Sequence, residues 1–131
     1  MLFERKQVFL WGPVILWAGL IFGLSHTPDL KSGLDCDFIL RKGAHMTEYL
    51  ILTLLLQRAV RGTWVLSLRQ VVFYSFAGAF LYAISDEFHQ SFIAGRVGSP
   101  VDVMIDTVGI VAASMGAYML EKILACRKCA R

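Results

Sequence analysis

The sequence is divided into four apolar blocks that are separated by short charged segments. The blocks cover about residues 8–25, 39–59, 70–88 and 101–120, and the first contains no charged residue. A helix of about 20 apolar residues is long enough to cross the hydrocarbon core of a bilayer. In lipid, only helices and closed barrels satisfy their own backbone hydrogen bonds, and blocks of this length fit helices. The pattern therefore predicts an all-α integral membrane protein, folded as a four-helix bundle.

The composition excludes several other classes of protein. Hydrophobic residues make up 56% of the 131 residues and charged residues 18%, whereas globular chains have about 25% charged residues. This excludes a conventional soluble enzyme, a disordered chain and a secreted miniprotein. The net charge of +3 comes without an arginine-rich stripe, which argues against binding of nucleic acid. Because no repeat or linker is visible, we expect a single domain over residues 1–131.

The positive charges predict an orientation in the cell membrane. Lysines and arginines concentrate in cytoplasmic segments of membrane proteins, and here most of them lie on one side of the four blocks. Both termini are therefore expected to be cytoplasmic, and most acids and all histidines to lie toward the extracytoplasmic side. The basic side contains Arg5, Lys6, Arg58, Arg61, Arg69, Lys122, Arg127, Lys128 and Arg131.

Several ionisable residues lie deep within the apolar blocks. With Arg58 taken as the inner boundary, the helical rise places Glu48 about 15 Å, His45 about 20 Å and Lys42 about 24 Å into the second block. Ionisable groups at such depths are costly unless they face the interior of a bundle or a wet cavity. They are therefore candidates for a functional site.

Helical spacing places these polar residues in stripes. Residues three or four positions apart share one face of a helix, and Gly109 would let a neighbouring helix approach the fourth block closely. Arg96, in the turn between the third and fourth blocks, is expected over the same outer end, so we predict a polar pocket that opens to the outer leaflet. The stripes are Lys42, His45, Glu48 and Tyr49; Tyr82, Asp86, His89 and Gln90; and Asp102 and Asp106.

A purely structural role is the alternative for these residues. Polar contacts between helices stabilise membrane bundles, and Lys42 or His45 could pair with an acid for that reason alone. Glu87 and Gln90 also fit a position at the water interface. Fewer residues would be enough for structural contacts, however, so their number at one end favours a ligand site.

The same segments resemble the signatures of the VanZ-like membrane proteins. The matching motifs are Arg41–Tyr49 (RKGAHMTEY), Ser85–Phe92 (SDEFHQSF), Gly95-Arg96 and Asp102–Gly109 (DVMIDTVG), and the resemblance covers nearly the whole chain. In one departure, Asp106 stands where the family usually has asparagine, which adds a negative charge. The resemblance implies an integral membrane protein and an association with resistance to the glycopeptide teicoplanin. It implies no particular reaction.

The preferred function is recognition of an anionic lipid or a lipid-linked molecule of the cell envelope. Such a head group needs cationic donors, and Arg96 with Lys42 would supply them, since arginine binds phosphate with two hydrogen bonds. The sequence leaves open whether the chain forms a homo-oligomer. The predicted ligand-binding residues are Lys42, Glu48, Tyr49, Glu87, Gln90, Arg96, Asp102 and Asp106.

Two further functions remain open. In a lipid-phosphate phosphatase or phosphotransferase, His45 and His89 would move protons or attack phosphorus, and Asp86 would orient an imidazole ring. These three are the catalytic residues expected if the protein is an enzyme, which the sequence does not decide. In an ion- or proton-coupled transporter, Glu48 would serve as a relay near the midplane.

No cofactor is predicted, and a divalent metal is the less favoured alternative. Nitrogen and oxygen ligands from His45, Glu48, Asp86 and His89 would suit zinc or a similar ion. The expected positive charges of the nearby lysine and arginine side chains argue against a cation, because they would repel it.

Overall fold

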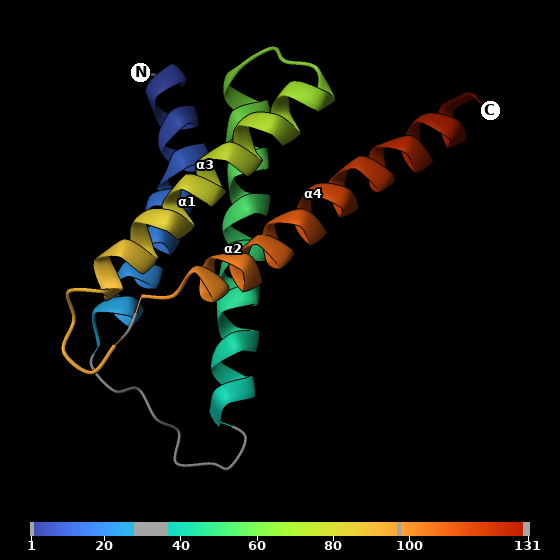
Figure 1. The fold of residues 1–131 in the computed structure, drawn as a ribbon. Helices are drawn as coiled ribbons and strands as arrows, with labels where there is room; N and C mark the ends of the chain where they lie inside the picture. The colour runs from blue at the N-terminus through green and yellow to red at the C-terminus, as the bar shows by residue number, and fades with distance from the viewer. Residues whose placement is uncertain (1, 28–36, 97, 130–131) are drawn as a thin grey trace.

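The computed structural model describes residues 2–27, 37–96 and 98–129, and within them it contains four helices and no strand. The helices are α1 (Leu2–His26), α2 (Asp37–Thr63), α3 (Leu68–Gln90) and α4 (Pro100–Cys129). Successive helices run in opposite directions, so both termini lie at one end, the terminal end (Figure 1). At the opposite, distal end, α1 and α3 finish and α2 and α4 begin. The predicted all-α, four-helix fold is confirmed.

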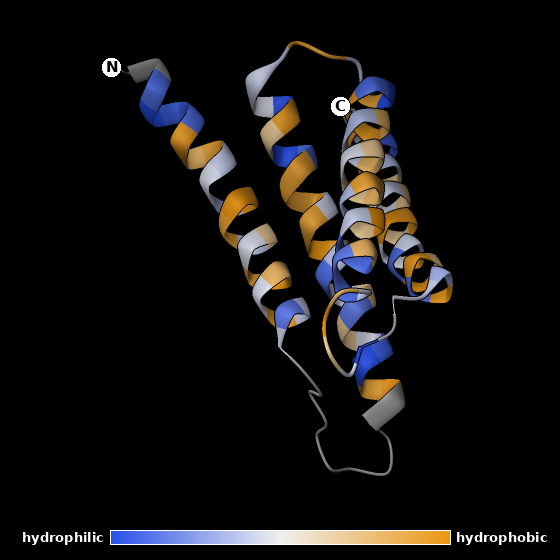
Figure 2. Ribbon diagram, turned by 60° about the vertical axis from the view of Figure 1, so that its left-hand side comes forward, coloured by the Kyte–Doolittle hydropathy of each residue, from blue (hydrophilic) through white to orange (hydrophobic). Residues whose placement is uncertain are grey.

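Three of the four helices are apolar enough to cross a membrane. They contribute Glu4–His26 of α1, Leu68–Gln90 of α3 and Pro100–Leu124 of α4. The distal half of α2 carries Lys42 and His45, which lower its apolar character, and hydrophilic residues gather at the distal end in Figure 2. Helix α2 contacts each of the other three helices. The least apolar helix therefore packs against all the others, as α3 also does.

The interior of the bundle combines small and polar side chains with an apolar core that includes Ile21, Leu52 and Ile110, while many other large apolar side chains face outward. Helix α3 shows this arrangement clearly, because Phe73, Leu81 and Phe88 on it are exposed. Without water to drive helices together, small residues allow close packing in a membrane, and polar groups bridge the helices. The outer surface of α3 is thus suited to lipid. Its buried residues are Val71, Ser75, Ala79, Ala83, Asp86, Glu87 and Gln90.

Helices α2 and α4 approach each other closely at Gly109. A Cβ atom added there would lie 3.0 Å from the carbonyl carbon of Met46 and 3.2 Å from the amide nitrogen of Leu50, and it would overlap the Met46 carbonyl oxygen. The predicted role of Gly109 in close approach is confirmed. Because Met46 follows His45, and Asp106 precedes Gly109 by about one turn, this contact brings the two ionisable side chains together.

Hydrogen bonds fix α1 against α2 and α3. The Trp17 indole Nε1 donates to the carbonyl of Glu48 at 2.9 Å, and the Tyr82 hydroxyl donates to the carbonyl of Ala18 at 2.7 Å. Helices α1 and α4 do not contact each other within the described ranges. Helix α1 therefore supports the faces of α2 and α3 from which the distal polar residues project.

Candidate functional site

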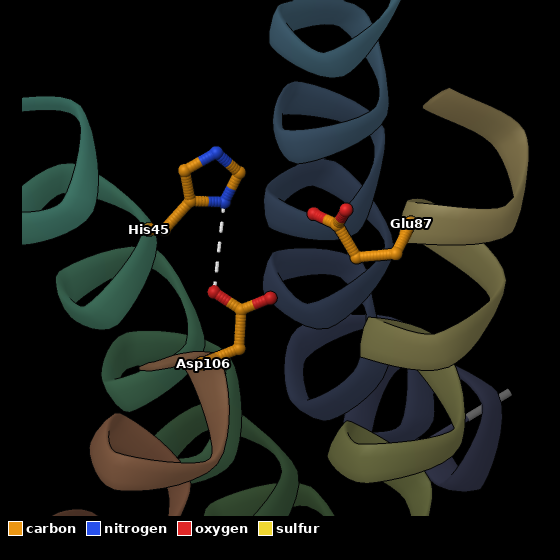
Figure 3. A group of neighbouring side chains, drawn as sticks. All are labelled: His45, Glu87 and Asp106. Atoms are coloured by element: carbon orange, nitrogen blue, oxygen red, sulfur yellow. Dashed lines mark ion pairs between the residues drawn. The ribbon is translucent and has the colours of Figure 1, made fainter. Parts of the chain in front are cut away.

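Three ionisable side chains from three helices meet near the distal end. His45 comes from α2, Glu87 from α3 and Asp106 from α4, and Figure 3 shows them turned toward a common space. One potential ligand atom from each residue lies within 4.8 Å of the other two. His45 Nδ1 and Asp106 Oδ1 are 3.5 Å apart. We call these three residues the distal cluster.

The two acids of the distal cluster are buried and its histidine is partly buried, yet most of its polar atoms have no hydrogen-bond partner. Asp106 is 0% exposed and Glu87 is 4% exposed. Within the described part of the chain, both carboxylate oxygens of Asp106, Glu87 Oε1 and His45 Nδ1 lack a hydrogen-bond partner, although His45 Nδ1 and Asp106 Oδ1 form an ion pair. Buried polar atoms are nearly always hydrogen-bonded, and leaving a buried carboxylate without a hydrogen bond is costly. The distal cluster therefore presents unused ligand atoms.

The second oxygen of Glu87 is occupied, and this fixes the direction of its side chain. Glu87 Oε2 accepts a hydrogen bond from the backbone amide of Ser99 at 2.9 Å. The loop before α4 lies close to this point, because a Cβ atom at Gly98 would overlap the backbone carbonyl oxygen of Glu87. The start of α4 thus holds Glu87 so that its other oxygen remains available.

An ion pair lies about one helical turn beyond the distal cluster, toward the distal end. Lys42 on α2 pairs with Asp102 on α4, and their side chains are 23% and 17% exposed. Each residue precedes its partner in the cluster by three or four positions, so Lys42 shares a face with His45, and Asp102 with Asp106. Lys42 and Asp102, two of the predicted ligand residues, therefore form a partly exposed ion pair on the distal side of the distal cluster.

Asp86 belongs to a separate hydrogen-bonded group between α1 and α3. Its Oδ2 accepts hydrogen bonds from the hydroxyl of Ser25 at 2.8 Å and from the side-chain amide of Gln90 at 3.0 Å. Asp86 is 2% exposed. Since Asp86 and Glu87 are consecutive in a helix, their side chains point in different directions, and only Glu87 joins the distal cluster.

Arg96 closes the distal end of α1. Its guanidinium donates to the backbone carbonyls of Leu24 at 2.9 Å and Thr27 at 3.1 Å, and to the side-chain oxygen of Gln90 at 3.2 Å. The last carbonyls of a helix lack partners within that helix, and a basic side chain can satisfy them. Arg96 was predicted over this end of the bundle, and it also has this structural role.

His89 lies beside His26 and not beside His45. Its Nε2 is 3.3 Å from Nδ1 of His26, and its ring stacks on Phe22 with ring centroids 4.5 Å apart. The three residues expected to be catalytic in an enzyme, His45, His89 and Asp86, thus have three different sets of neighbours. Their catalytic role stays a prediction.

Of the remaining predicted residues, Tyr49 is fully buried and Glu48 is half-buried. The Tyr49 hydroxyl has no hydrogen-bond partner among the described residues, and its ring lies 6.3 Å from that of Tyr82. Glu48 contributes its backbone carbonyl to the contact with Trp17. Both residues lie on α2 within a turn of His45.

Two cavities in the described part of the chain lie away from this site. One, of about 180 Å³, is near the terminal end between α2, α3 and α4 and is lined partly by Arg58, Arg61 and Glu121. The other is a hollow beside Arg69 and Tyr118. The pocket predicted to open to the outer leaflet therefore stays a prediction.

Sequence reasoning did not find Ser25 and Ser99, which position the two buried acids of α3. Both serines lie at helix ends or in loops, where serine is common for local reasons. The one feature of the sequence that could have indicated a role for them is their position, because each serine lies next to the distal end of a predicted helix. Glu87 was predicted as a ligand residue, but its position outside the regular stripe on α3 gave no indication that it joins His45 and Asp106.

Apolar helices that enclose buried ionisable side chains define this chain as a helical membrane protein with a polar site at one end. The family model described as VanZ/LLP1 matches residues 5–121. The chain therefore belongs to the VanZ/LLP1 family, as the resemblance of its motifs predicted. The comparisons with curated proteins and with solved structures gave no match.

Proposed function

We propose that this VanZ-like membrane protein recognises the phosphate-bearing head group of an anionic lipid or lipid-linked molecule of the cell envelope. Recognition takes place at the distal end, which faces the outside of the cell, with both termini in the cytoplasm. The distribution of lysine and arginine supports this multi-pass orientation. The observation that carries the proposal is the distal cluster, whose buried ligand atoms are unused.

A purely structural role accounts poorly for the distal cluster. Residues that only hold helices together gain stability by satisfying one another, as Asp86 does through Oδ2, which accepts from Ser25 and Gln90, although its Oδ1 has no hydrogen-bond partner among the described residues. In contrast, both oxygens of Asp106 lack a hydrogen-bond partner among the described residues. A buried group that loses solvation without gaining a partner lowers stability. Such groups are retained at sites where a ligand supplies the missing interaction.

Lys42 is the residue best placed to meet a phosphate group. It is partly exposed, and it lies about one helical turn from His45 toward the distal end. A lysine ammonium binds phosphate through charge-assisted hydrogen bonds, and its ion pair with Asp102 holds it in place. Binding of a lipid-linked envelope precursor would change how much of that precursor is available. This would connect the site with glycopeptide resistance.

Replacing Lys42 by alanine should weaken the binding of polyprenyl phosphate by about tenfold or more, because one charge-assisted hydrogen bond contributes about 1.5–3 kcal/mol. The matched control is Arg61→Ala. Arg61 also lies on α2 and pairs with an acid on α4, Glu121, but it does so at the terminal end. Binding is measured by native mass spectrometry of the purified protein in detergent.

The control also tests the rival site, because Arg61 lines the terminal cavity. We expect Arg61→Ala to bind polyprenyl phosphate as the wild type does. Loss of binding in Arg61→Ala with full binding in Lys42→Ala would place the ligand at the terminal end and overturn the proposal. Circular dichroism confirms that both variants are folded.

Hydrolysis of the phosphate ester is a second candidate function. It is favoured by the 3.5 Å approach of His45 Nδ1 to Asp106 Oδ1, since a carboxylate beside an imidazole orients the ring for proton transfer. The test is release of inorganic phosphate from polyprenyl phosphate and phospholipids. If the protein hydrolyses the ester, His45→Ala should stop the release of phosphate and Arg61→Ala should retain it. If the wild type releases no phosphate, recognition without hydrolysis is the remaining function.

A further inference from the structure

The charge of the distal end presents a difficulty for an anionic ligand. Five acids lie in this region, namely Glu48, Asp86, Glu87, Asp102 and Asp106. The basic side chains near them are engaged in contacts of their own, since Lys42 pairs with Asp102 and Arg96 donates to the end of α1. A phosphate group placed beside two buried carboxylates would be repelled. A source of positive charge is needed next to the distal cluster.

We propose that His45, Glu87 and Asp106 bind one divalent transition-metal cation of the zinc or manganese kind. The ion accepts a phosphate oxygen of the ligand in an open coordination position. The ion-binding part of this inference stands on the geometry of the distal cluster, and the part about phosphate rests on the proposed function. A mixed set of one imidazole and two carboxylates suits Zn²⁺ and Mn²⁺.

The distances within the distal cluster fit a shared ion. Ligand atoms about 2.1 Å from a tetrahedral ion are about 3.4 Å from each other, and His45 Nδ1 and Asp106 Oδ1 are 3.5 Å apart. The third donor, from Glu87, completes a set whose atoms all lie within 4.8 Å of one another. The hydrogen bond from Ser99 engages Oε2 of Glu87, and Oε1 is left without a hydrogen-bond partner among the described residues.

The burial of the carboxylates provides the second argument. Asp106 is 0% exposed and points into the space between the other two side chains (Figure 3). Neither of its oxygens has a hydrogen-bond partner within the described ranges. Two carboxylates balance the charge of a divalent cation, so the ion would remove the cost of burying them. Three protein ligands leave one position open, as in catalytic zinc sites.

The positive charges of Lys42 and Arg96 would repel a cation, but the contacts that these residues make reduce the repulsion. The ion pair with Asp102 offsets the charge of Lys42. Arg96 directs its guanidinium to the carbonyls of Leu24 and Thr27, on the α1 side of the bundle. The metal ligands considered from the sequence differ from these, because Asp86 and His89 have other neighbours.

The test uses Mn²⁺ as a paramagnetic probe. The full chain is purified in detergent and treated with a chelator, and bound Mn²⁺ is then counted by electron paramagnetic resonance. We expect one bound ion per wild-type chain, displaced by Zn²⁺, and at least about tenfold weaker binding in Glu87→Gln and Asp106→Asn. Glu121→Gln is the matched control, since it removes a carboxylate of α4 at the terminal end, and it should bind as the wild type does.

A second variant distinguishes ligation from an indirect effect. In Asp106→Cys, a thiolate of similar reach replaces the carboxylate, and bound Co²⁺ should show sulfur-to-metal charge-transfer absorption. Absence of Mn²⁺ and Zn²⁺ binding by folded wild-type protein would overturn the metal site, as would equal binding by Glu87→Gln and the wild type. If polyprenyl phosphate binds equally well in chelator, the inference that the ion accepts a phosphate oxygen fails, and the proposed function stands. If the ion binds and polyprenyl phosphate does not, the metal site stands and the proposed function fails.

Discussion

Replacing Gly109 by alanine should lower the free energy of unfolding by about 2–3 kcal/mol, because overpacking at a close contact costs about this much. The added methyl group would overlap the backbone carbonyl oxygen of Met46. Backbone atoms cannot move aside as a flexible side chain does, so α4 must move away from α2. This movement separates Asp106 from His45, and binding of Mn²⁺ and of polyprenyl phosphate should fall as well.

Gly116→Ala is the matched control for this variant. Gly116 lies two turns further along α4, is exposed, and has open space where a Cβ atom would be added. Alanine at this position should leave stability unchanged or raise it by up to about 1 kcal/mol, since glycine disfavours a helix interior. Unfolding is followed by circular dichroism during titration with dodecyl sulfate. Equal stability of the two variants would contradict the close packing at Gly109.

Replacing Asp106 by asparagine should have opposite effects on stability and on binding. In the presence of a chelator, and at about pH 9 where imidazole is neutral, the variant should be more stable than the wild type by about 1–3 kcal/mol. The reason is that asparagine removes a buried charge whose oxygens have no hydrogen-bond partner among the described residues. Binding of polyprenyl phosphate, measured without chelator, should fall by about tenfold or more.

The comparison variant is Asp86→Asn on the neighbouring helix. Asp86 is equally buried, but its carboxylate accepts hydrogen bonds from Ser25 and Gln90. Its replacement should therefore lower the free energy of unfolding under the same conditions. A loss of stability in Asp106→Asn with unchanged lipid binding would instead show that Asp106 holds the helices together and has no part in a ligand site.

The number and length of the helices could be predicted because both depend on local features of the sequence. The apolar blocks are as long as a membrane is thick, and the charged segments separate them. The close approach at Gly109 was predictable for the same reason, since a small residue beside a polar stripe favours helix packing. The polar stripe of α2 was also visible, through its spacing of three and four residues.

The membership of the distal cluster could not be derived in full from spacing. Spacing assigns residues to a face of their own helix, but it does not say which neighbouring helix that face meets. Asp86 and Glu87 differ by one position in the chain, yet Asp86 binds Ser25 of α1 and Glu87 lies with His45 and Asp106. The rotation of α3 decides between these arrangements, and that rotation depends on packing across the whole bundle. The contact between His89 and His26 has the same origin.

The most direct measurement of the central claim compares two ligands that differ only in the phosphate. Wild-type protein in detergent is titrated with polyprenyl phosphate and with the corresponding polyprenol, and the bound fraction of each is measured by native mass spectrometry. Recognition of the head group predicts at least about tenfold tighter binding of the phosphate, which corresponds to about 1.4 kcal/mol. Equal binding of the two lipids would contradict the account, because the protein would then recognise only the hydrocarbon chain.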